Sequence, residues 1–350
     1  MRAITVLPGI ANSARLDEVP EPPPSDGAIL VRTRALGVCA TDREILSGAY
    51  GTAPPGQGRL VLGHKSLGTV ETAPADSEVA PGDLVVGIVR RPDPQPCSAC
   101  AVGEWDMCRN GGYTERGIKE RHGYGAERFR IEPEFVVKVD PALDILGVLL
   151  EPASVLAKAW NHIERIGQRA RGWQPRSLLV TGAGPIGLLA ALMGKQRGLD
   201  VHVLDQVTKG AKPRLVHGID ATYHHSDMDA VMERVRPDVV IEATGVPTLV
   251  FGALAGTAAY GITVLTGVSS RGRTIRVDGG ELNRDIVLEN DAVVGSVNAN
   301  LRHYEQAADA LAKADPDWLG QLVSRRVPLA DFADAFEPRD DDVKVVLTFD

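Results

Sequence analysis

The feature that most constrains the fold of this chain is a glycine-rich turn, which joins an apolar run to a helical pattern in LLVTGAGPIGLLAALMGKQRG (178–198). Gly182, Gly184 and Gly187 form the pattern G-x-G-x-x-G. The first glycine permits a tight turn, the second lets the backbone approach a pyrophosphate, and the third lets the helix pack close to the sheet. The helix N-terminus favours the anion. The pattern predicts a dinucleotide site; the alternative is a glycine-rich turn of another α/β fold.

An acidic residue, Asp205, ends the next apolar run, 18 residues after Gly187. A carboxylate at this spacing accepts hydrogen bonds from the adenosine ribose. It favours NAD because it would repel the 2′-phosphate of NADP, but Lys209, Lys212 and Arg214 follow closely and keep NADP as an alternative. The other residues predicted to contact the dinucleotide are Pro185, Ile186, Thr244, Gly267, Val268 and Asn298.

Apolar runs and helical patterns alternate after Ser177, as in DVHVLD (200–205), DVVIEATG (238–245) and GITVLTG (261–267). This alternation predicts an α/β fold with a doubly wound parallel sheet of the Rossmann type. The earlier part of the chain has short β-type runs separated by Gly and Pro, which predict a β-rich domain. We expect a β-rich domain over 1–150, a Rossmann domain over 151–290 and a segment that returns to the first domain over 291–350.

Charge and composition argue against several classes of protein. The net charge is −8, with 24% charged and 44% hydrophobic residues, so no excess of positive charge invites nucleic acid or an anionic membrane. No apolar run approaches the ~20 residues that span a bilayer. Pro8 and Gly9 interrupt the N-terminal apolar run where a signal peptide needs an unbroken core. We expect a cytoplasmic protein.

The four cysteines are unevenly placed, because Cys97, Cys100 and Cys108 lie within twelve residues and Cys39 is isolated. An intracellular chain of this length needs no disulfide. The clustered thiols therefore suggest a metal site.

Several motifs together resemble the zinc-dependent medium-chain dehydrogenases, most closely their glucose dehydrogenase branch. They are GVCATDREI, LGHKSLG, RRPDPQPCSACAVGEWDMC, YTERGI, LLEPAS, IEATG and GSVNANLRHYEQA, and they run through nearly the whole chain. The resemblance implies a GroES-like catalytic domain interrupted by the Rossmann domain. It also implies an oxidoreductase that moves hydride between NAD(P) and a CH–OH group of a sugar or sugar-like alcohol, and a homodimer or homotetramer.

The resemblance implies a catalytic zinc held by Cys39, His64 and Glu151. A thiolate, an imidazole and a carboxylate leave a fourth tetrahedral position open for water or a substrate oxygen. Zinc there would act as a Lewis acid. Thr41 resembles the hydroxyl that relays the substrate proton, and Asp42 is a candidate partner behind a metal ligand.

Lys65 departs from the family, which usually has an acid after the histidine. An ammonium about 5 Å from Zn²⁺ would cost several kcal/mol even at an effective dielectric of roughly 20. Lys65 could point outward and leave zinc on three ligands, be neutral beside the metal, or pair with Glu151 in place of zinc and donate a proton. A surface lysine of no consequence is the fourth alternative. We expect zinc to be retained, since three ligands suffice.

The cysteine cluster resembles the structural zinc site of some family members, which has the spacing C-x2-C-x2-C-x7-C. Cys97, Cys100 and Cys108 match its last three thiols, and Pro94, which cannot bind metal, takes the place of the first. Asp93 is the candidate fourth ligand. Three thiolates in one loop favour a structural zinc. A Cys97–Cys100 redox pair and three free thiols are the alternatives.

The resemblance also implies that Glu115 and Asn298 bind a polyol, with Asn300 and His303 as further candidates. Carboxylates and amides suit sugar hydroxyls. The alternatives are a surface charge at Glu115 and a turn residue at Asn298. The aromatic content of 5% argues against a platform for a polymeric sugar, so we expect one small polar ring, a sugar or cyclitol.

Two other functions compete with the zinc sugar dehydrogenase. One is a reductase of a biosynthetic intermediate that lacks the catalytic zinc and uses Lys65 as its proton donor. The other is a sensor that binds NAD without catalysis.

Overall fold

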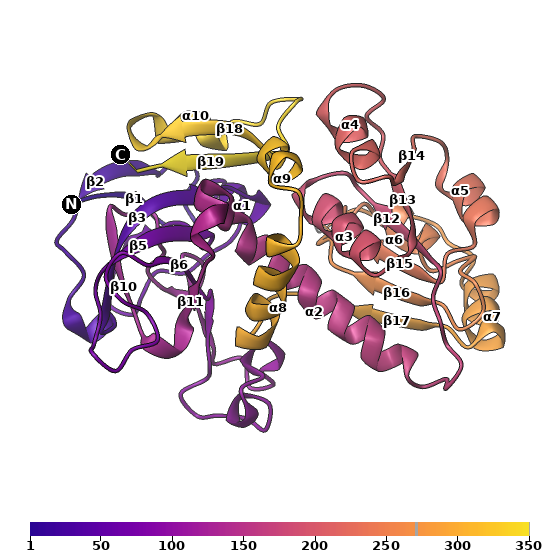
Figure 1. The fold of residues 1–350 in the computed structure, drawn as a ribbon, viewed down its shortest axis with the longest axis horizontal. Coiled ribbons are helices and arrows are strands. Elements are labelled where there is room, and N and C mark those ends of the chain that lie inside the picture. Colours follow the sequence, from indigo (N-terminus) through magenta and orange to yellow (C-terminus); the bar gives the residue numbers. More distant parts are fainter. Residues whose placement is uncertain (270–271, 350) are drawn as a thin grey trace. The chain divides into compact units, whose positions relative to one another are not determined.

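The computed structural model describes residues 1–269 and 272–349, which form two compact units. The first unit consists of Met1–Ser154 and the C-terminal segment that starts at Asn298, and the second is Val155–Val297. Both chain termini therefore belong to the first unit (Figure 1).

The first unit is built on a seven-stranded sheet in which β3 (Ile29–Gly37) pairs with three other strands. The C-terminal segment contributes two of its strands, and Val346 lies opposite Gly37 in the antiparallel register of β19 with β3. The sheet order is β11 (Val136–Lys138), β6 (Leu84–Gly87), β5 (Ser66–Thr72), β3, β19 (Lys344–Thr348) and β18 (Val323–Pro328), and β10 (Arg128–Ile131) pairs with β3 off this path.

The alternation of side chains along β3 explains why this segment forms a central strand. Ile29, Val31 and Ala35 are fully buried, whereas Arg32 and Arg34 between them face solvent. Successive side chains of a strand point to opposite faces, so this pattern gives the sheet one apolar face. The first unit therefore builds its core on that face.

Smaller elements complete the first unit (Figure 1). Two further sheets contain β2 (Arg15–Glu18), β1 (Arg2–Val6) and β4 (Leu60–Val61), and β7 (Arg90–Arg91), β8 (Thr114–Arg116) and β9 (Glu120–Arg121). Its α-helices are α1 (Ala40–Leu46), α8 (Leu301–Ala312), α9 (Pro316–Leu322) and α10 (Phe332–Phe336). Its short 3₁₀ helices are η1 (Pro24–Asp26), η2 (Cys100–Val102), η3 (Trp105–Met107), η4 (Pro133–Phe135), η5 (Pro141–Leu149) and η6 (Leu329–Asp331).

The second unit is a parallel six-stranded sheet with helical crossovers. The helix α2 (Leu150–Gly167) leads into it, and Pro152 is tolerated because it lies in the first turn of that helix. The sheet order is β14 (Thr222–His224), β13 (Asp200–Leu204), β12 (Ser177–Thr181), β15 (Val239–Glu242), β16 (Ile262–Leu265) and β17 (Ala292–Gly295). Its other helices are α3 (Pro185–Gln196), α4 (Ala211–His217), α5 (Met228–Val235), α6 (Pro247–Gly252) and α7 (Gly279–Glu289).

Burial along these strands follows their place in the sheet. Every residue of the central β15 is buried, whereas the edge strand β17 alternates between half-buried and exposed residues. Continuous apolar runs are typical of parallel strands covered on both faces. The predicted α/β fold with a Rossmann-type sheet is confirmed. Among the described residues, no helix is long and apolar enough to cross a membrane.

Candidate active site

Cys39 occupies the N-cap position of α1, two residues after the last residue of the central strand β3. Its backbone is extended, and its N–H donates to Asp42 Oδ2 over 2.9 Å, while the Cys39 side chain accepts from the Asp42 N–H. This reciprocal cap fixes both side chains within one helical turn. Thr41, the predicted proton relay, is half-buried in the same turn.

His64 lies in the loop between β4 and β5 and joins the two residues of that cap. Its Nε2 is 3.2 Å from Cys39 Sγ, and its Nδ1 is 3.4 Å from Asp42 Oδ1. In the described part of the chain, neither His64 Nδ1 nor Asp42 Oδ1 makes a hydrogen bond with any other group. The carboxylate therefore orients the imidazole, whose other nitrogen faces the thiol.

The charges of these three groups support one another. Burial and Asp42 act to raise the pKa of the Cys39 thiol, but Lys65 and His64 lower it below its ordinary value. Burial and Lys65 act to lower the pKa of His64, but the Cys39 and Asp42 anions raise it to about 10. Burial acts to raise the pKa of Asp42, but His64 lowers it to about 2. The arrangement favours an imidazolium between a thiolate and a carboxylate.

Lys65 turns inward and binds Glu151, which lies in the first turn of α2. Its Nζ is 2.6 Å from Glu151 Oε2, and each side chain is only 9% exposed. Burial acts to lower the pKa of Lys65, but the Cys39 and Glu151 anions raise it above the ordinary lysine value. Glu151 is therefore held by an ammonium, and it does not join the compact group of Cys39, Asp42 and His64, whose ligand atoms lie within 4.8 Å of one another.

A second buried lysine, Lys344 of β19, lies beside this pair. It is 2% exposed, and its Nζ donates to the carbonyl oxygen of Val38 over 2.8 Å. Gly37 makes room for it, because a Cβ at Gly37 would lie 2.8 Å from Lys344 Cε and 3.2 Å from Lys65 Cβ. Burial and the neighbouring Lys65 lower the pKa of Lys344 to about 8.

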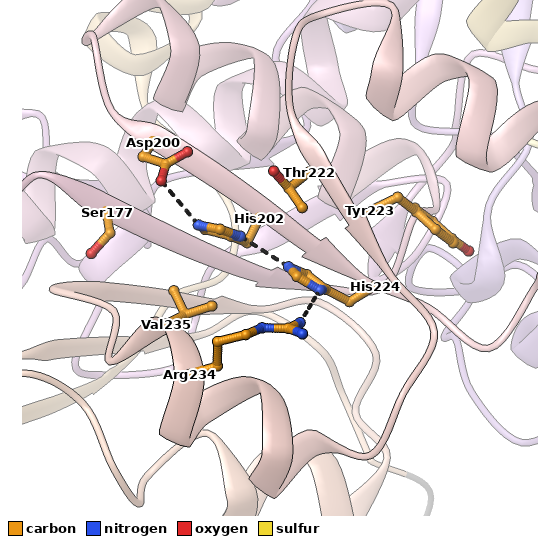
Figure 2. Close-up of a pocket in the computed structure, with 8 residues that line it drawn as sticks. All are labelled: Ser177, Asp200, His202, Thr222, Tyr223, His224, Arg234 and Val235. Atoms are coloured by element: carbon orange, nitrogen blue, oxygen red, sulfur yellow. Dashed lines mark hydrogen bonds and ion pairs between the residues drawn. The ribbon is translucent and has the colours of Figure 1, made fainter.

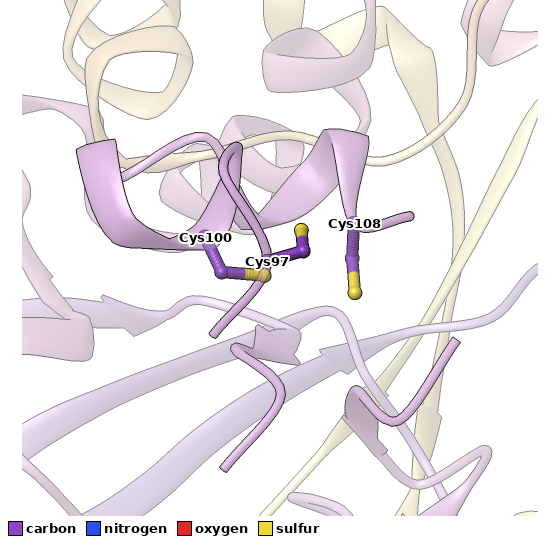
Figure 3. A group of neighbouring side chains, drawn as sticks. All are labelled: Cys97, Cys100 and Cys108. Atoms are coloured by element: carbon purple, nitrogen blue, oxygen red, sulfur yellow. The ribbon is translucent and has the colours of Figure 1, made fainter. Parts of the chain in front are cut away.

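Cys97, Cys100 and Cys108 form a second group of converging ligands (Figure 3). Cys100 begins the 3₁₀ turn η2, Cys97 precedes that turn, and Cys108 directly follows η3. Their sulfur atoms lie within 4.8 Å of one another. Backbone N–H groups, that of Arg109 first among them, lower the pKa of Cys97 to about 6. The carboxylate of Asp93, the predicted fourth ligand, is not in this group, and its Oδ1 accepts from the N–H of Gln95 over 2.8 Å.

Glu115 and Asn298, the predicted polyol contacts, meet in the first unit. Asn298 Nδ2 donates to Glu115 Oε1 over 2.6 Å, and the guanidinium of Arg90 donates to the same oxygen from Nε and Nη2 over 3.1 and 3.0 Å. Asn300 and His303 instead cap α8 together, and Asn300 Nδ2 donates to Asp106 Oδ1 over 2.8 Å. The structure thus separates the four candidates into a carboxylate–amide pair and a helix cap.

The glycine-rich turn of the second unit has the conformation that its sequence pattern requires. Gly182 has φ 91°, which favours glycine, and a Cβ at Gly187 would overlap the carbonyl oxygen of Gly182. Gly184 is the N-cap of α3, with Pro185 and Ile186 in the first turn after it. The first N–H groups of an α-helix have no acceptor within the helix, so the start of α3 is suited to bind an anion.

Asp205 closes this turn through backbone contacts. Its carboxylate accepts from the N–H of Ala183 over 2.7 Å and of Val207 over 3.0 Å, and Lys212 Nζ lies 3.3 Å from Oδ2. Thr244 follows the end of β15, the strand that pairs with β12, and its N–H donates to the buried carboxylate of Glu242 over 2.7 Å.

Two more predicted dinucleotide residues lie beside Thr244. A Cβ at Gly267 would overlap the N–H of Gly245, and a Cβ at Gly245 would lie 2.5 Å from the carbonyl oxygen of Val268. The segments that contain Thr244, Gly267 and Val268 therefore lie together in the second unit. Asn298, predicted as a further dinucleotide contact, belongs to the first unit.

Comparison with known proteins identifies the family. Models of the glucose dehydrogenase C-terminus and of the alcohol dehydrogenase GroES-like domain match residues 145–349 and 25–141. Glucose 1-dehydrogenases of Thermoproteus tenax and Methanocella arvoryzae are 41% and 39% identical to the chain, each over 99% of both proteins. Glucose dehydrogenase of Haloferax mediterranei, in complex with NADP, Zn and gluconolactone, has a TM-score of 0.92 at 34% identity, covering 100% of this chain and 99% of that one.

The chain belongs to the zinc-type medium-chain alcohol dehydrogenases, in their glucose dehydrogenase branch. This confirms the family predicted from the sequence motifs, and with it an NAD(P)-dependent oxidoreductase that acts on CH–OH groups. The resemblance implies two zinc sites in this dehydrogenase, one at Cys39, His64 and Glu151 and one at the cluster of Cys97, Cys100 and Cys108.

The Cys39 centre consists of Cys39, Asp42, His64, Lys65, Glu151 and Lys344. This centre fits a zinc with three protein ligands only in part. Cys39 and His64 converge with suitable donor atoms, and Asp42 stands behind the imidazole as carboxylates do in zinc sites. Glu151, the third implied ligand, is paired with Lys65 through Oε2, so a metal would have to share this carboxylate with a buried ammonium. The residues as they stand therefore do not supply the three-ligand set.

The cysteine lobe, which is the group of Cys97, Cys100 and Cys108, fits a structural zinc better. Three thiols converge there, and within the described part of the chain the donor to Cys97 Sγ is the backbone N–H of Arg109 and not a charged side chain. Cys97, Cys100 and Cys108 would hold the ion, which would tie the turns η2 and η3 together. The Asp93 carboxylate is not among the converging ligand atoms, so it would have to move to become the fourth ligand.

The second unit contains a further polar cluster, which the sequence analysis did not predict (Figure 2). Arg234 donates to His224 Nδ1 over 2.7 Å, His224 Nε2 lies 2.9 Å from His202 Nδ1, and His202 Nε2 lies 3.2 Å from Asp200 Oδ2. Because arginine can only donate, His224 accepts at Nδ1 and donates from Nε2 to His202 Nδ1, and His202 donates from Nε2 to Asp200. Each imidazole in this arrangement carries one N–H and accepts at its other nitrogen. An open pocket of about 470 Å³ is lined by these four residues and Ser177, Thr222, Tyr223 and Val235.

Sequence reasoning missed several buried charged residues near the predicted sites, among them Arg90, Asp106, Glu242 and Lys344. For Glu242 and Lys344 a signal existed, because each is a single charge within an apolar run of a buried strand and must have a partner. Arg90 and Asp106 find their partners only through distant segments, and no local pattern marks them.

Proposed function

We propose that this dehydrogenase oxidises the C1 hydroxyl of an aldose, glucose or a close relative, to the lactone. The C1–H bond breaks and its hydrogen leaves as hydride to the nicotinamide, while the hydroxyl proton passes to the Thr41 hydroxyl and on to solvent. Two electrons thus move from the sugar to the dinucleotide. Support comes from the names of the full-length relatives and from the gluconolactone bound to the Haloferax mediterranei enzyme.

The observation that carries this proposal is the fixed carboxylate of Glu115. Arg90 and Asn298 place three donors on Oε1, so the carboxylate is held in one orientation with its charge balanced. The described hydrogen bonds leave Oε2 for a ligand, and a carboxylate oxygen accepts from more than one sugar hydroxyl. The same unit carries Cys39, Thr41 and His64.

We propose NAD as the preferred dinucleotide, with NADP as a weaker alternative. The carboxylate of Asp205 stands at the end of β13, where it would accept from the adenosine ribose and repel a 2′-phosphate. Lys212, 3.3 Å from that carboxylate, reduces the repulsion. The Haloferax mediterranei relative has been captured with NADP, which is consistent with use of both forms in this branch. We also propose the homodimer or homotetramer that the family implies.

The test is the appearance of NADH in a panel of aldoses, polyols and cyclitols, with the purified full-length chain. We expect aldoses of the glucose type to be oxidised, and Glu115→Gln to raise the KM for sugar at least tenfold with a smaller change in the KM for NAD. Glu120→Gln, which makes the same change at an exposed position of the neighbouring strand, should leave both unchanged. Absence of turnover on every sugar, with dinucleotide still bound, would overturn the proposal in favour of a sensor.

A further inference from the structure

The pairing of Lys65 with Glu151 conflicts with the metal centre that the family implies. Their Nζ and Oε2 atoms are 2.6 Å apart, and the two side chains are equally buried. A short pair between buried opposite charges satisfies both groups, and removing either partner leaves the other uncompensated. Glu151 is therefore already engaged by a cation that belongs to the chain itself.

The wider charge balance of the centre points the same way. Three acidic groups, Cys39, Asp42 and Glu151, face two lysines, Lys65 and Lys344. The two buried lysines already bring positive charge to Glu151 and to the Val38 carbonyl, and a divalent ion would add two further positive charges to the same buried site. Charges of one sign confined away from water repel strongly.

The backbone is shaped to admit the two lysines. The missing side chain of Gly37 leaves the space through which Lys344 reaches the Val38 carbonyl and beside which Lys65 packs. Lys344 is fixed by the register of β19 with β3, and Lys65 immediately precedes β5 in the same sheet. The ammonium groups are thus set by the sheet and not by flexible surface segments.

We propose that the Lys65 ammonium, held by Glu151, stands in place of the catalytic metal, so that the chain binds zinc at the cysteine lobe and not at Cys39. For its catalytic consequence this inference rests on the proposed function. As hydride leaves the sugar carbon, the ammonium donates a hydrogen bond to the oxygen on which negative charge develops, and it keeps its own protons. The hydroxyl proton still leaves through Thr41.

The experiment counts zinc per chain by mass spectrometry in the full-length protein, produced with zinc in excess. We expect one zinc in the unchanged protein, no loss with Cys39→Ser, and loss of that zinc with Cys100→Ser. Lys65→Glu restores the acid that the family has and should raise the count by one, and adding Cys39→Ser to it should remove the extra ion. Lys138→Glu, the same change at a lysine that is 55% exposed, should leave the count at one.

Cobalt gives a second readout that does not depend on activity. Thiolate-bound Co²⁺ absorbs visible light, so Lys65→Glu should show an additional thiolate–cobalt band that is lost with Cys39→Ser. The proposal is overturned if the unchanged protein holds two zinc ions and Cys39→Ser removes one of them. That result can be obtained even where Lys65→Glu does not fold.

Activity separates the failure of this proposal from the failure of the proposed function. Sugar oxidation by a protein with zinc only at the lobe supports both. One zinc without sugar oxidation supports the ammonium in place of metal and overturns the sugar dehydrogenase. Sugar oxidation that requires a second zinc bound at Cys39 overturns only the present proposal.

Discussion

The dinucleotide turn of the second unit and the Cys39 centre of the first are built in different ways. The turn is made of backbone, and its shape depends on three glycines within six residues. The centre is made of side chains from the start of α1, the loop before β5, the start of α2 and the strand β19, and their charges must balance. A single substitution such as that of an acid by Lys65 can therefore change the charge of the centre while the fold is kept. In the turn, a single added side chain at Gly187 already conflicts with the backbone.

The largest expected effect comes from Gly187→Ala in the turn. The added methyl group would overlap the Gly182 carbonyl oxygen, so α3 must shift away from the turn that positions its N–H groups. Returning α3 to the position that binds the dinucleotide would cost the energy of this overpacking, ~3 kcal/mol. That energy corresponds to about a hundredfold loss of affinity, and we expect at least this loss for NAD binding measured by calorimetry. Gly320→Ala in α9, where a Cβ meets open space, is the matched control and should bind NAD normally.

The next effect tests whether the centre depends on charge balance. Glu151→Gln leaves the Lys65 ammonium buried without its anion, and we expect a loss of about 3 kcal/mol in the free energy of unfolding, measured with denaturant. Adding Lys65→Met should recover most of this loss, because the pair is then removed as a whole. If Glu151→Gln costs less than ~1 kcal/mol, the pair does not organise the centre.

The contrast between turn and centre also explains what the sequence could predict. The spacing of Gly182, Gly184 and Gly187 and the acid at Asp205 are local, so fold and dinucleotide turn followed from one segment. The family motifs brought Cys39 and His64 into one site. They could not show whether the Lys65 side chain points outward or towards Glu151. Its charged neighbours Glu151 and Cys39 come from other segments, and only the folded chain shows which of them lie near it.

The cysteine lobe was predicted in part for the same reason. Cys97, Cys100 and Cys108 follow a recognisable spacing and converge as expected. Asp93 is adjacent in sequence to the missing position, but its carboxylate is held by the N–H of Gln95, a turn contact that spacing alone does not reveal.

A smaller effect asks whether the second unit also contains a charge-dependent site. Burial lowers the pKa of His224 to about 4, and the charges of His202, Arg234 and His225 act in the same direction. Because the unfolded state binds a proton near pH 6.5 and the folded state does not, stability is complete above that pH and falls as the pH drops towards 4.

We expect the melting temperature of the full-length protein to fall between pH 7 and pH 4.5, and His224→Gln to reduce this dependence while lowering the value at pH 7. His217→Gln, at an exposed position of the same unit, serves as the control. An unchanged pH dependence in His224→Gln would show that the chain of Asp200, His202, His224 and Arg234 does not control stability.

The smallest effect concerns the choice between the two dinucleotides. Lys212 lies 3.3 Å from Asp205 and offsets the repulsion that its carboxylate exerts on a 2′-phosphate. Lys212→Gln should raise the KM for NADP about fivefold, equivalent to ~1 kcal/mol, and leave the KM for NAD within a factor of two. Lys195→Gln, whose ammonium binds the Asp220 carbonyl instead, should change neither value. An equal rise in the KM for both dinucleotides would mean that Lys212 acts by holding the shape of the loop after Asp205 and not by its positive charge. The choice between NAD and NADP would then depend on the backbone of the second unit, as the dinucleotide turn does.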